Sequence, residues 1–150
     1  MTAITLEAIE AAHKQVEAMI AAFKEAQPAF PITVPAPSLK PGEKFIGVIL
    51  SADGSRRHAL VLLPGETEET NWKKASEWAT SQGGELPDRV EGALLFATLK
   101  EEFKSEWYWT REQHAGYDDS AWCQYFGNGR QDDVRKGGQC RARAVRRLAI

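Results

Sequence analysis

A cluster of prolines divides this chain into segments that cannot belong to one continuous helix. Proline fixes φ and lacks a backbone N–H group, so a dense run of prolines forbids a helix and favours an extended, semi-rigid segment. Five of the seven prolines lie close together, at Pro28, Pro31, Pro35, Pro37 and Pro41. We therefore predict three regions: an N-terminal helix at residues 1–27, a proline-rich linker at 28–44 and a globular domain at 45–150.

The residues before the prolines have the spacing of an amphipathic helix. Between residues 5 and 27, members of one stripe recur alternately three and four positions apart. The stripe consists of Leu6, Ile9, His13, Val16, Ile20 and Phe23. This strict spacing is typical of a short coiled coil, so we predict a homo-oligomer, dimer or trimer, in which the polar His13 sets the register or the number of strands. The alternative is a helix packed on its own domain; an isolated helix of this length is only marginally stable.

The residues after the linker predict an α+β domain. The Asp53-Gly54 pair between two apolar runs is typical of a β-hairpin. Asp88 with Glu91 three positions later resembles a capping box at the start of a helix. The predicted elements follow in this order: strands at 45–50 and 59–63, helices at 71–82 and from 88 onward, and strands at 107–110, 121–126 and 140–148.

The charge of the chain limits its partners. The formal net charge is -2, which argues against general affinity for nucleic acid. A local exception is the segment 130–150, with seven Lys or Arg residues against two Asp. We interpret this basic tail as a strand face with ion-pair partners; a phosphate-binding site is the alternative. The sequence contains no signal-peptide pattern and no run long enough to span a membrane, so we expect no membrane insertion.

Four motifs in a fixed order carry a resemblance to a known family. They are Gly-Glu-Leu-Pro-Asp-Arg at 84–89, Trp-Tyr-Trp-Thr at 107–110, the strand 121–126 that begins Ala-Trp, and the arginine-rich segment 141–147. Together they resemble a phage and prophage domain of unknown function, which is similar to the C-terminal domain of bacterial collagen-like adhesins and is placed near the C-type lectin-like fold. The resemblance covers roughly residues 45–148. It implies two helices, a twisted antiparallel sheet and a ligand surface built from the loops between the last strands.

Two polar loops, at 111–120 and 127–139, form the predicted ligand surface. Their glycines, amphipathic rings and charges of both signs suit contact with another macromolecule. Tyr125 is predicted to face outward beside them. The expected contacts are His114, Tyr117, Asp118 and Asp119 in the first loop and Asn128, Arg130, Gln131, Asp132, Asp133, Arg135 and Lys136 in the second. The alternative is that both loops are merely solvated.

The residue patterns of metal and catalytic sites are missing from the sequence. C-type lectins that bind calcium carry a Trp-Asn-Asp strand, whereas Trp122 is followed here by Cys123 and Gln124. Acidic pairs in loops are usually solvated, and His114, Cys123 and Cys140 lack the ligand spacing of a zinc site. We therefore expect no metal, no cofactor and no catalytic residue, and two free thiols because no secretion signal is present.

These observations favour a phage or prophage accessory protein that binds a host protein or a glycan without catalysis. Fold alone cannot decide this, because the C-type lectin-like fold is shared by carbohydrate binders, protein binders and an enzyme. One alternative is an intracellular inhibitor that sequesters a host defence protein or a phosphate-bearing signal molecule. Another is a redox or copper enzyme that uses the two cysteines. The expected location is the host cytoplasm or the virion.

Overall fold

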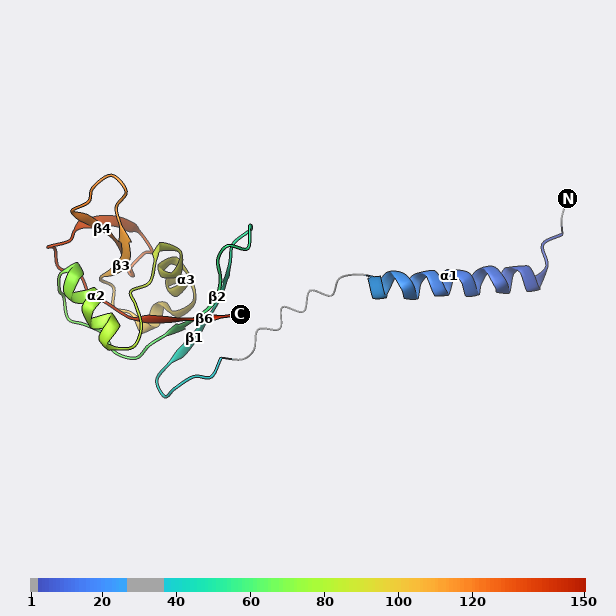
Figure 1. Cartoon of the computed structure of the whole chain (residues 1–150), viewed down its shortest axis with the longest axis horizontal. Coiled ribbons are helices and arrows are strands. Elements are labelled where there is room, and N and C mark those ends of the chain that lie inside the picture. The colour runs from blue at the N-terminus through green and yellow to red at the C-terminus, as the bar shows by residue number, and fades with distance from the viewer. Residues whose placement is uncertain (1–2, 27–36) are drawn as a thin grey trace. The chain divides into compact units, whose positions relative to one another are not determined.

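The structure, a computed structural model, describes residues 3–26 and 37–150 (Figure 1). The chain divides into two compact units, Met1–Thr33 and Val34–Ile150, which are described separately. In the first unit, helix α1 spans Leu6–Ala26 and none of its residues is buried. This confirms the predicted helix. None of the helices among residues 3–26 and 37–150 combines the length and the hydropathy of a membrane span.

The second unit begins in the predicted linker, which lies largely outside the described residues. Residues 37–40 have no regular structure, residues 41–42 form a turn, and strand β1 begins at Lys44. The unit contains two three-stranded antiparallel sheets. One has the order β1-β2-β6, with β1 at Lys44–Leu50, β2 at Arg57–Leu62 and β6 at Val145–Ala149. The other has the order β3-β4-β5, with β3 at Trp107–Gln113, β4 at Ser120–Tyr125 and β5 at Gln131–Arg135.

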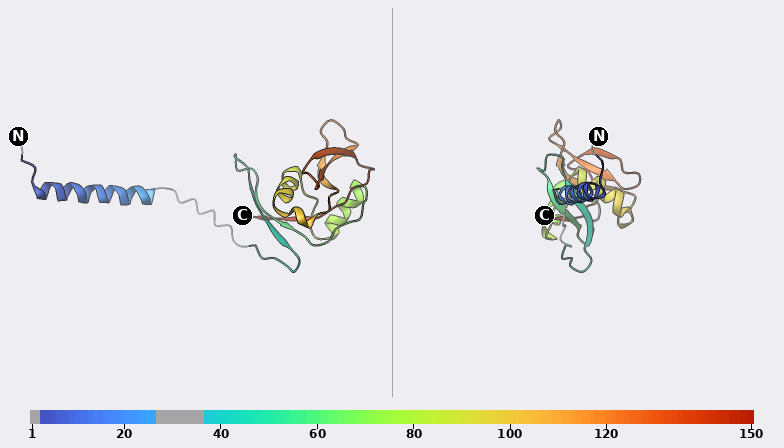
Figure 2. Two further views of the ribbon diagram at one scale, coloured as in Figure 1. Left: turned by 180° about the vertical axis from the view of Figure 1, so that it is seen from behind. Right: turned by 90° about the vertical axis from the view of Figure 1, so that its right-hand side faces the viewer.

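Two α-helices pack on these sheets. Helix α2 (Trp72–Ser81) contacts β3, and α3 (Arg89–Leu99) contacts β1, β3 and β4, so α3 lies between the two sheets (Figure 2). A short 3-10 helix, η1 (Lys100–Glu102), follows α3. The local signals hold: the Asn71 side chain caps α2, and both hydrogen bonds of the predicted capping box are present at the start of α3.

The packing produces two apolar clusters. One lies between α2 and the β3-β4-β5 sheet around Trp109, which is fully buried, and Trp72, Trp78 and Trp107 pack against it. The other lies between α3 and the hairpin β1-β2, and includes Leu60 and Phe126. Trp122 belongs to neither cluster, and it is the tryptophan that lies beside the candidate site.

Three boundaries predicted from the sequence are wrong. The second loop, 127–139, contains strand β5, and the first loop is reduced to 114–119 because β3 continues to Gln113. The last strand begins at Val145 and not at residue 140. The first two errors have one cause, since β5 and the end of β3 are polar segments whose strand conformation is imposed by hydrogen bonds to β4 and not by an alternating apolar pattern. In the last strand, Cys140 and Arg141 form only isolated bridges, to Thr70 and Tyr108, so the continuous strand begins later.

Candidate functional site

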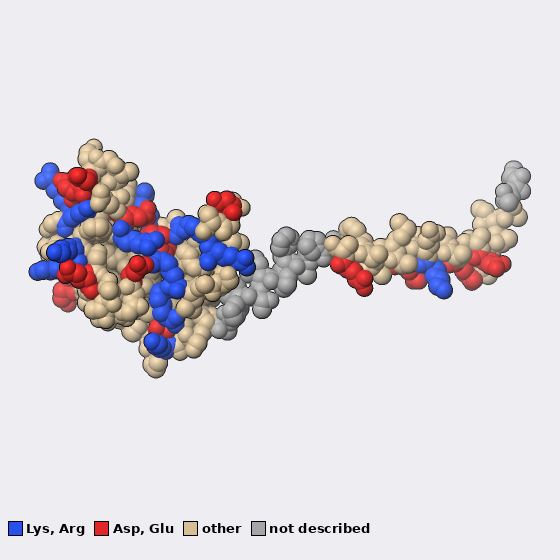
Figure 3. Space-filling model, in the orientation of Figure 1, with Lys and Arg blue, Asp and Glu red and all other residues tan. Residues whose placement is uncertain are grey.

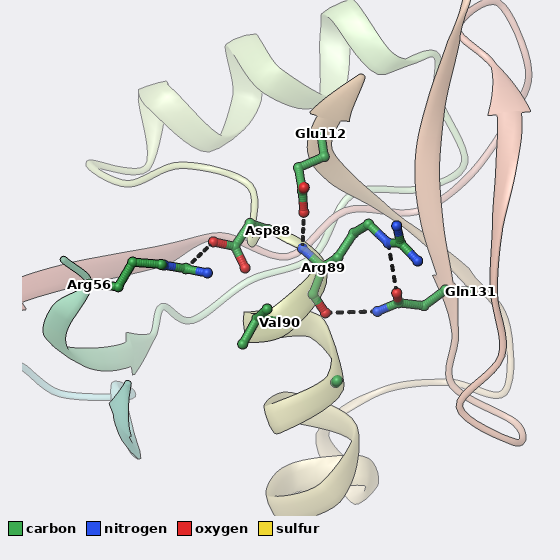
Figure 4. A pocket seen from close by; sticks show the side chains of 7 residues that line it. Arg56, Asp88, Arg89, Val90, Glu112 and Gln131 are labelled. Carbon is green, nitrogen blue, oxygen red and sulfur yellow. Dashed lines mark hydrogen bonds and ion pairs between the residues drawn. The ribbon is translucent and has the colours of Figure 1, made fainter. Parts of the chain in front are cut away.

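A polar pocket of about 450 Å³ opens beside the N-terminus of α3 (Figure 4). Four segments that are distant in sequence build it. The lining residues are Arg56 from the β1-β2 turn, Asp88, Arg89, Val90 and Ala93 from the start of α3, Glu112 from β3 and Gln131 from β5. Concave sites with a few converging polar groups are the usual form of small binding sites.

Asp88 links the hairpin side of the pocket to the helix. Its Oδ1 accepts the backbone N–H of Glu91 at 2.9 Å, which caps α3, and its Oδ2 accepts a hydrogen bond from Arg56. Burial alone would raise the pKa of Asp88. Hydrogen bonds with Glu91 and the positive charge of Arg56 outweigh burial, so the pKa of Asp88 is lowered. Asp88 is therefore held as a carboxylate that anchors Arg56.

Arg89 forms the opposite side of the pocket. Its Nε donates to Gln131 Oε1 at 3.0 Å, while Gln131 Nε2 donates to the Arg89 carbonyl oxygen at 2.7 Å (Figure 4). The Arg89 backbone N–H donates to Glu112 Oε2 at 2.5 Å. The guanidinium carbon lies 3.7 Å from the ring centroid of Trp122, a cation–π contact. Three strands thus fix the first residue of α3 and the direction of its side chain.

A buried ion pair between Glu91 and Arg147 fixes the helix end beside the pocket. Glu91 is fully buried, and its Oε1 accepts from Arg147 Nη2 at 2.8 Å. Burial raises the pKa of Glu91, and the hydrogen bonds from Arg147 oppose this effect. His58 Nε2 lies 3.6 Å from Glu91 Oε2 and has no hydrogen-bond partner among the described residues. This group joins β2, β6 and α3, and so holds the helix end at which the pocket opens.

An aromatic group extends the pocket toward the β3-β4 turn. The His114 ring lies 5.1 Å from Trp122 and 4.8 Å from Tyr117, measured between centroids. The backbone N–H groups of Gly116 and Tyr117 donate to His114 Nδ1 and thereby fix the turn. Tyr117 is 61% exposed. We call the pocket together with Trp122, His114 and Tyr117 the Arg89 surface.

The structure divides the predicted ligand residues between different places. Gln131 lines the pocket, and His114 and Tyr117 form the aromatic end of the Arg89 surface. Asp133 pairs with Trp122 in the β4-β5 register, so the two side chains share a face of the sheet. Asp118 and Asp119 are exposed in the β3-β4 turn.

The remaining predicted residues lie elsewhere. Tyr125 alternates with Trp122 to the opposite face of β4, where it is half-buried and its ring lies 5.2 Å from Trp107. Arg130 pairs with Asp132 at 2.5 Å, and the Asn128 side chain accepts the Arg130 N–H, so these three form a local turn. Lys136 donates to Gln113 and lies over the ring of Trp72, whereas Arg135 is exposed. These residues do not converge on the pocket.

Ion pairs neutralise most of the basic tail. Arg141 pairs with Glu66, Glu68 and Glu106, Arg146 with Glu43, and Arg147 with Glu85 and Glu91. Arg143 is buried and donates to the carbonyl oxygens of Glu102 and Leu63. Figure 3 accordingly shows Lys and Arg next to Asp and Glu on the visible face of the domain. The ion-paired interpretation is confirmed, but the paired arginines are largely shielded from solvent and do not form a solvated strand face.

The two cysteines are free and buried. Their Sγ atoms lie 3.4 Å apart, and burial together with the neighbouring Cys140 raises the pKa of the Cys123 thiol. A thiol with a raised pKa is a poor nucleophile. Among residues 3–26 and 37–150, no three His, Cys, Asp or Glu side chains gather as a metal site.

Sequence reasoning missed the four charged residues of the pocket, which are Arg56, Asp88, Arg89 and Glu112. The sequence alone indicates Asp88 only as a helix cap and Arg89 only as part of a family motif. One signal is present in the sequence: a capping aspartate followed by an arginine places a charged pair at the start of a helix. No local pattern indicates that β3 and β5 contact this helix start. No family model and no curated protein matches the chain.

Proposed function

We propose that this chain is a non-enzymatic binding protein of a phage or prophage, and that its domain is C-type lectin-like and holds a host protein or glycan at the Arg89 surface. The observation that carries the proposal is the meeting of four distant segments in one polar pocket, next to the exposed ring of Tyr117 and the half-buried rings of His114 and Trp122. The order strand, strand, helix, helix and then strands, in two small antiparallel sheets, supports the fold assignment.

Unused hydrogen-bond donors support ligand binding. Only Nε of the Arg89 side chain, and only Nη2 of Arg56, has a hydrogen-bond acceptor among the described residues. The other guanidinium nitrogens are therefore available to a ligand that carries oxygen acceptors. Aromatic rings beside arginines are typical of the contacts that dominate recognition surfaces.

The two carboxylates of the pocket already accept hydrogen bonds from the protein, and this supports a role without catalysis. Asp88 already accepts hydrogen bonds from the helix end and from Arg56, and Glu112 accepts the Arg89 backbone N–H. A general base must be able to reach a proton of the substrate. Both carboxylates instead hold the binding surface in shape.

The test is capture of a ligand from host lysate and envelope fractions by the immobilised full chain. We expect Arg89→Gln and Tyr117→Ala to reduce capture roughly tenfold or more, because each removes a central side chain of the surface. Lys73→Ala is the matched control, since the Lys73 side chain is 85% exposed on α2. Capture by both variants at the level of the unchanged chain, with circular dichroism spectra also unchanged, would reject the Arg89 surface.

We also propose that α1 associates with copies of itself and so presents several binding domains together. Such multivalency raises the avidity of weak individual sites without any new contact. The support is the heptad stripe of exposed apolar side chains on α1. The mass of the full chain in solution tests this directly, and a monomer at all accessible concentrations would refute it.

A further inference from the structure

Exposed apolar side chains are concentrated on α1. Among the described residues, seven of the twelve large hydrophobic side chains that are exposed lie between residues 4 and 23. The charged side chains of α1 gather on one side of the helix and leave another side uncharged (Figure 3). Helices in proteins owe most of their stability to packing of an apolar face, and none of the 21 residues of α1 is buried.

The stripe has the regular pattern of a coiled-coil seam. In heptad positions abcdefg, the a positions are Leu6, His13 and Ile20, and the d positions are Ile9, Val16 and Phe23. Each of the five apolar members is at least half exposed, from 50% at Ile20 to 71% at Leu6. A seven-residue repeat on a helix is satisfied by wrapping around helices with the same repeat.

We infer that α1 forms a parallel coil of three or more copies of this chain, in which His13 is the single polar layer and makes the assembly dissociate in acid. This inference rests on the self-association proposed above and specifies its geometry and regulation. The number of strands follows from the d positions. Two of them, Ile9 and Val16, are β-branched, a choice that disfavours two-stranded coils and favours three or four strands.

The charge pattern selects the parallel orientation. The e positions carry Glu10, Glu17 and Lys24, whereas two g positions are the uncharged Ala12 and Met19. An antiparallel coil centred on the stripe would place the e positions of neighbouring helices together and bring Glu10 of one copy beside Glu17 of the next, which is repulsive. A parallel coil places e against g, so no like charges meet.

The position of His13 selects the same orientation. In a parallel coil each a residue meets the same a residue of the other copies, so the imidazoles form a layer of their own and can hydrogen-bond to one another. In the antiparallel arrangement each His13 would face Val16, and its polar nitrogens would be buried against an apolar side chain. The parallel register therefore satisfies the only polar group of the seam.

Acid dissociation follows from the charges that face this layer. Histidine gains its charge between about pH 8 and pH 5, so acidification places like charges at the axis, where the other copies of His13 are the groups in contact. Glu17 Oε1 lies 3.7 Å from His13 Nδ1 on the same helix, but both side chains are largely exposed, and such pairs contribute little. The flanking Glu10 and Glu17 of the other copies are equally solvated, and Lys14 lies outside the seam. Repulsion at the axis therefore dominates.

Sedimentation of the full chain at about pH 7.5 and about pH 5 tests the inference. We expect three or more copies near neutrality. In acid, we expect the dissociation constant of the assembly to be higher by roughly tenfold or more. His13→Ile should remain assembled at both pH values, because the layer becomes apolar. Gln15→His is the matched control, since it places a histidine at an outer c position, and in the His13→Ile background it should not restore acid dissociation.

The outcomes separate this inference from the proposals on which it rests. A monomer at both pH values would reject self-association itself, and a dimer would reject the strand number. A stable assembly of unchanged affinity in acid would leave self-association intact and overturn the role of His13. Orientation is tested with Leu6→Cys under mild oxidation, because the a residues of different copies meet in a parallel coil: linked copies support the parallel coil, and their absence from an assembled sample rejects it.

Discussion

Replacing Glu91 with alanine tests whether a buried ion pair fixes the start of α3. The fully buried Glu91 carboxylate accepts hydrogen bonds from Arg147 Nη2 at 2.8 Å and from Arg147 Nε at 3.0 Å. It also accepts the backbone N–H of Asp88 at 3.1 Å, which completes the capping box. The substitution removes the ion pair with Arg147 and the capping-box hydrogen bond together. It leaves the positive charge of the Arg147 guanidinium with fewer negatively charged partners.

The expected cost can be worked from these contacts. Removing one partner of a buried ion pair costs about 3 to 5 kcal/mol. Arg147 keeps its ion pair with Glu85 and a hydrogen bond to the Leu86 carbonyl oxygen, so the lower end of this range applies. Loss of the capping-box contact adds up to about 1 kcal/mol. We expect the free energy of unfolding to fall by about 3 to 4 kcal/mol, and Tm by roughly 10 °C.

Urea unfolding of the full chain, followed by circular dichroism, measures this difference. The control is Glu77→Ala on α2, because the Glu77 side chain is 64% exposed and lies 4.0 Å from Lys73. Exposed pairs of this kind contribute at most about 1 kcal/mol. A double-mutant cycle with Arg147→Ala isolates the coupling. The reasoning fails if Glu91→Ala costs no more than Glu77→Ala, or if the losses from Glu91→Ala and Arg147→Ala simply add.

Three further predictions use other features of the domain. Gly84→Ala should lower the free energy of unfolding by about 2 kcal/mol or more, because its Cβ would lie 2.4 Å from a carbonyl oxygen of β6; Gly137→Ala, with open space around it, is the control in the same urea titration. Hydrogen bonds from an arginine of β6 lower the pKa of Glu43 from 4.5 to about 2, so its contribution to stability is present above about pH 4.5 and lost as pH falls toward 2. Glu43→Gln should remove that part of the acid dependence of Tm, and an unchanged pH profile would contradict it. Cys123 and Cys140 should not react with a thiol reagent at pH 8 until denaturant is added, since both are buried; rapid reaction of the folded chain would show that the thiols are accessible.

Several elements could be predicted because their signals are local. The helix α1 follows from its heptad spacing, the hairpin β1-β2 from the Asp53-Gly54 turn, and the starts of α2 and α3 from the caps at Asn71 and Asp88. Each signal acts over a few residues, through side-chain hydrogen bonds to neighbouring backbone groups or through restricted φ and ψ values. Such constraints act on the chain before tertiary contacts form.

Strand β5 could not be predicted in this way. Its sequence is polar, and its strand conformation comes from pairing with β4, in a register that places Gln131 opposite Gln124. That register also determines which residues of the second predicted loop lie on the same face of the sheet as the candidate site. Gln131 and Asp133 face the side of Trp122, whereas Asp132 faces the side of Cys123.

Local signals were sufficient to predict helix α1 and the α+β class of the domain, because heptad spacing, turn residues and capping residues act over a few positions. The position of the candidate site, in contrast, depends on contacts between segments that are far apart in the sequence. Arg56, Arg89 and Glu112 acquire a common pocket through the packing of α3 between two sheets. Three arginines of the basic tail are neutralised in the same way, since glutamates distant in sequence pair with Arg141, Arg146 and Arg147. Charge pairing depends on distance in space, and local periodicity carries no information about which distant residues will meet.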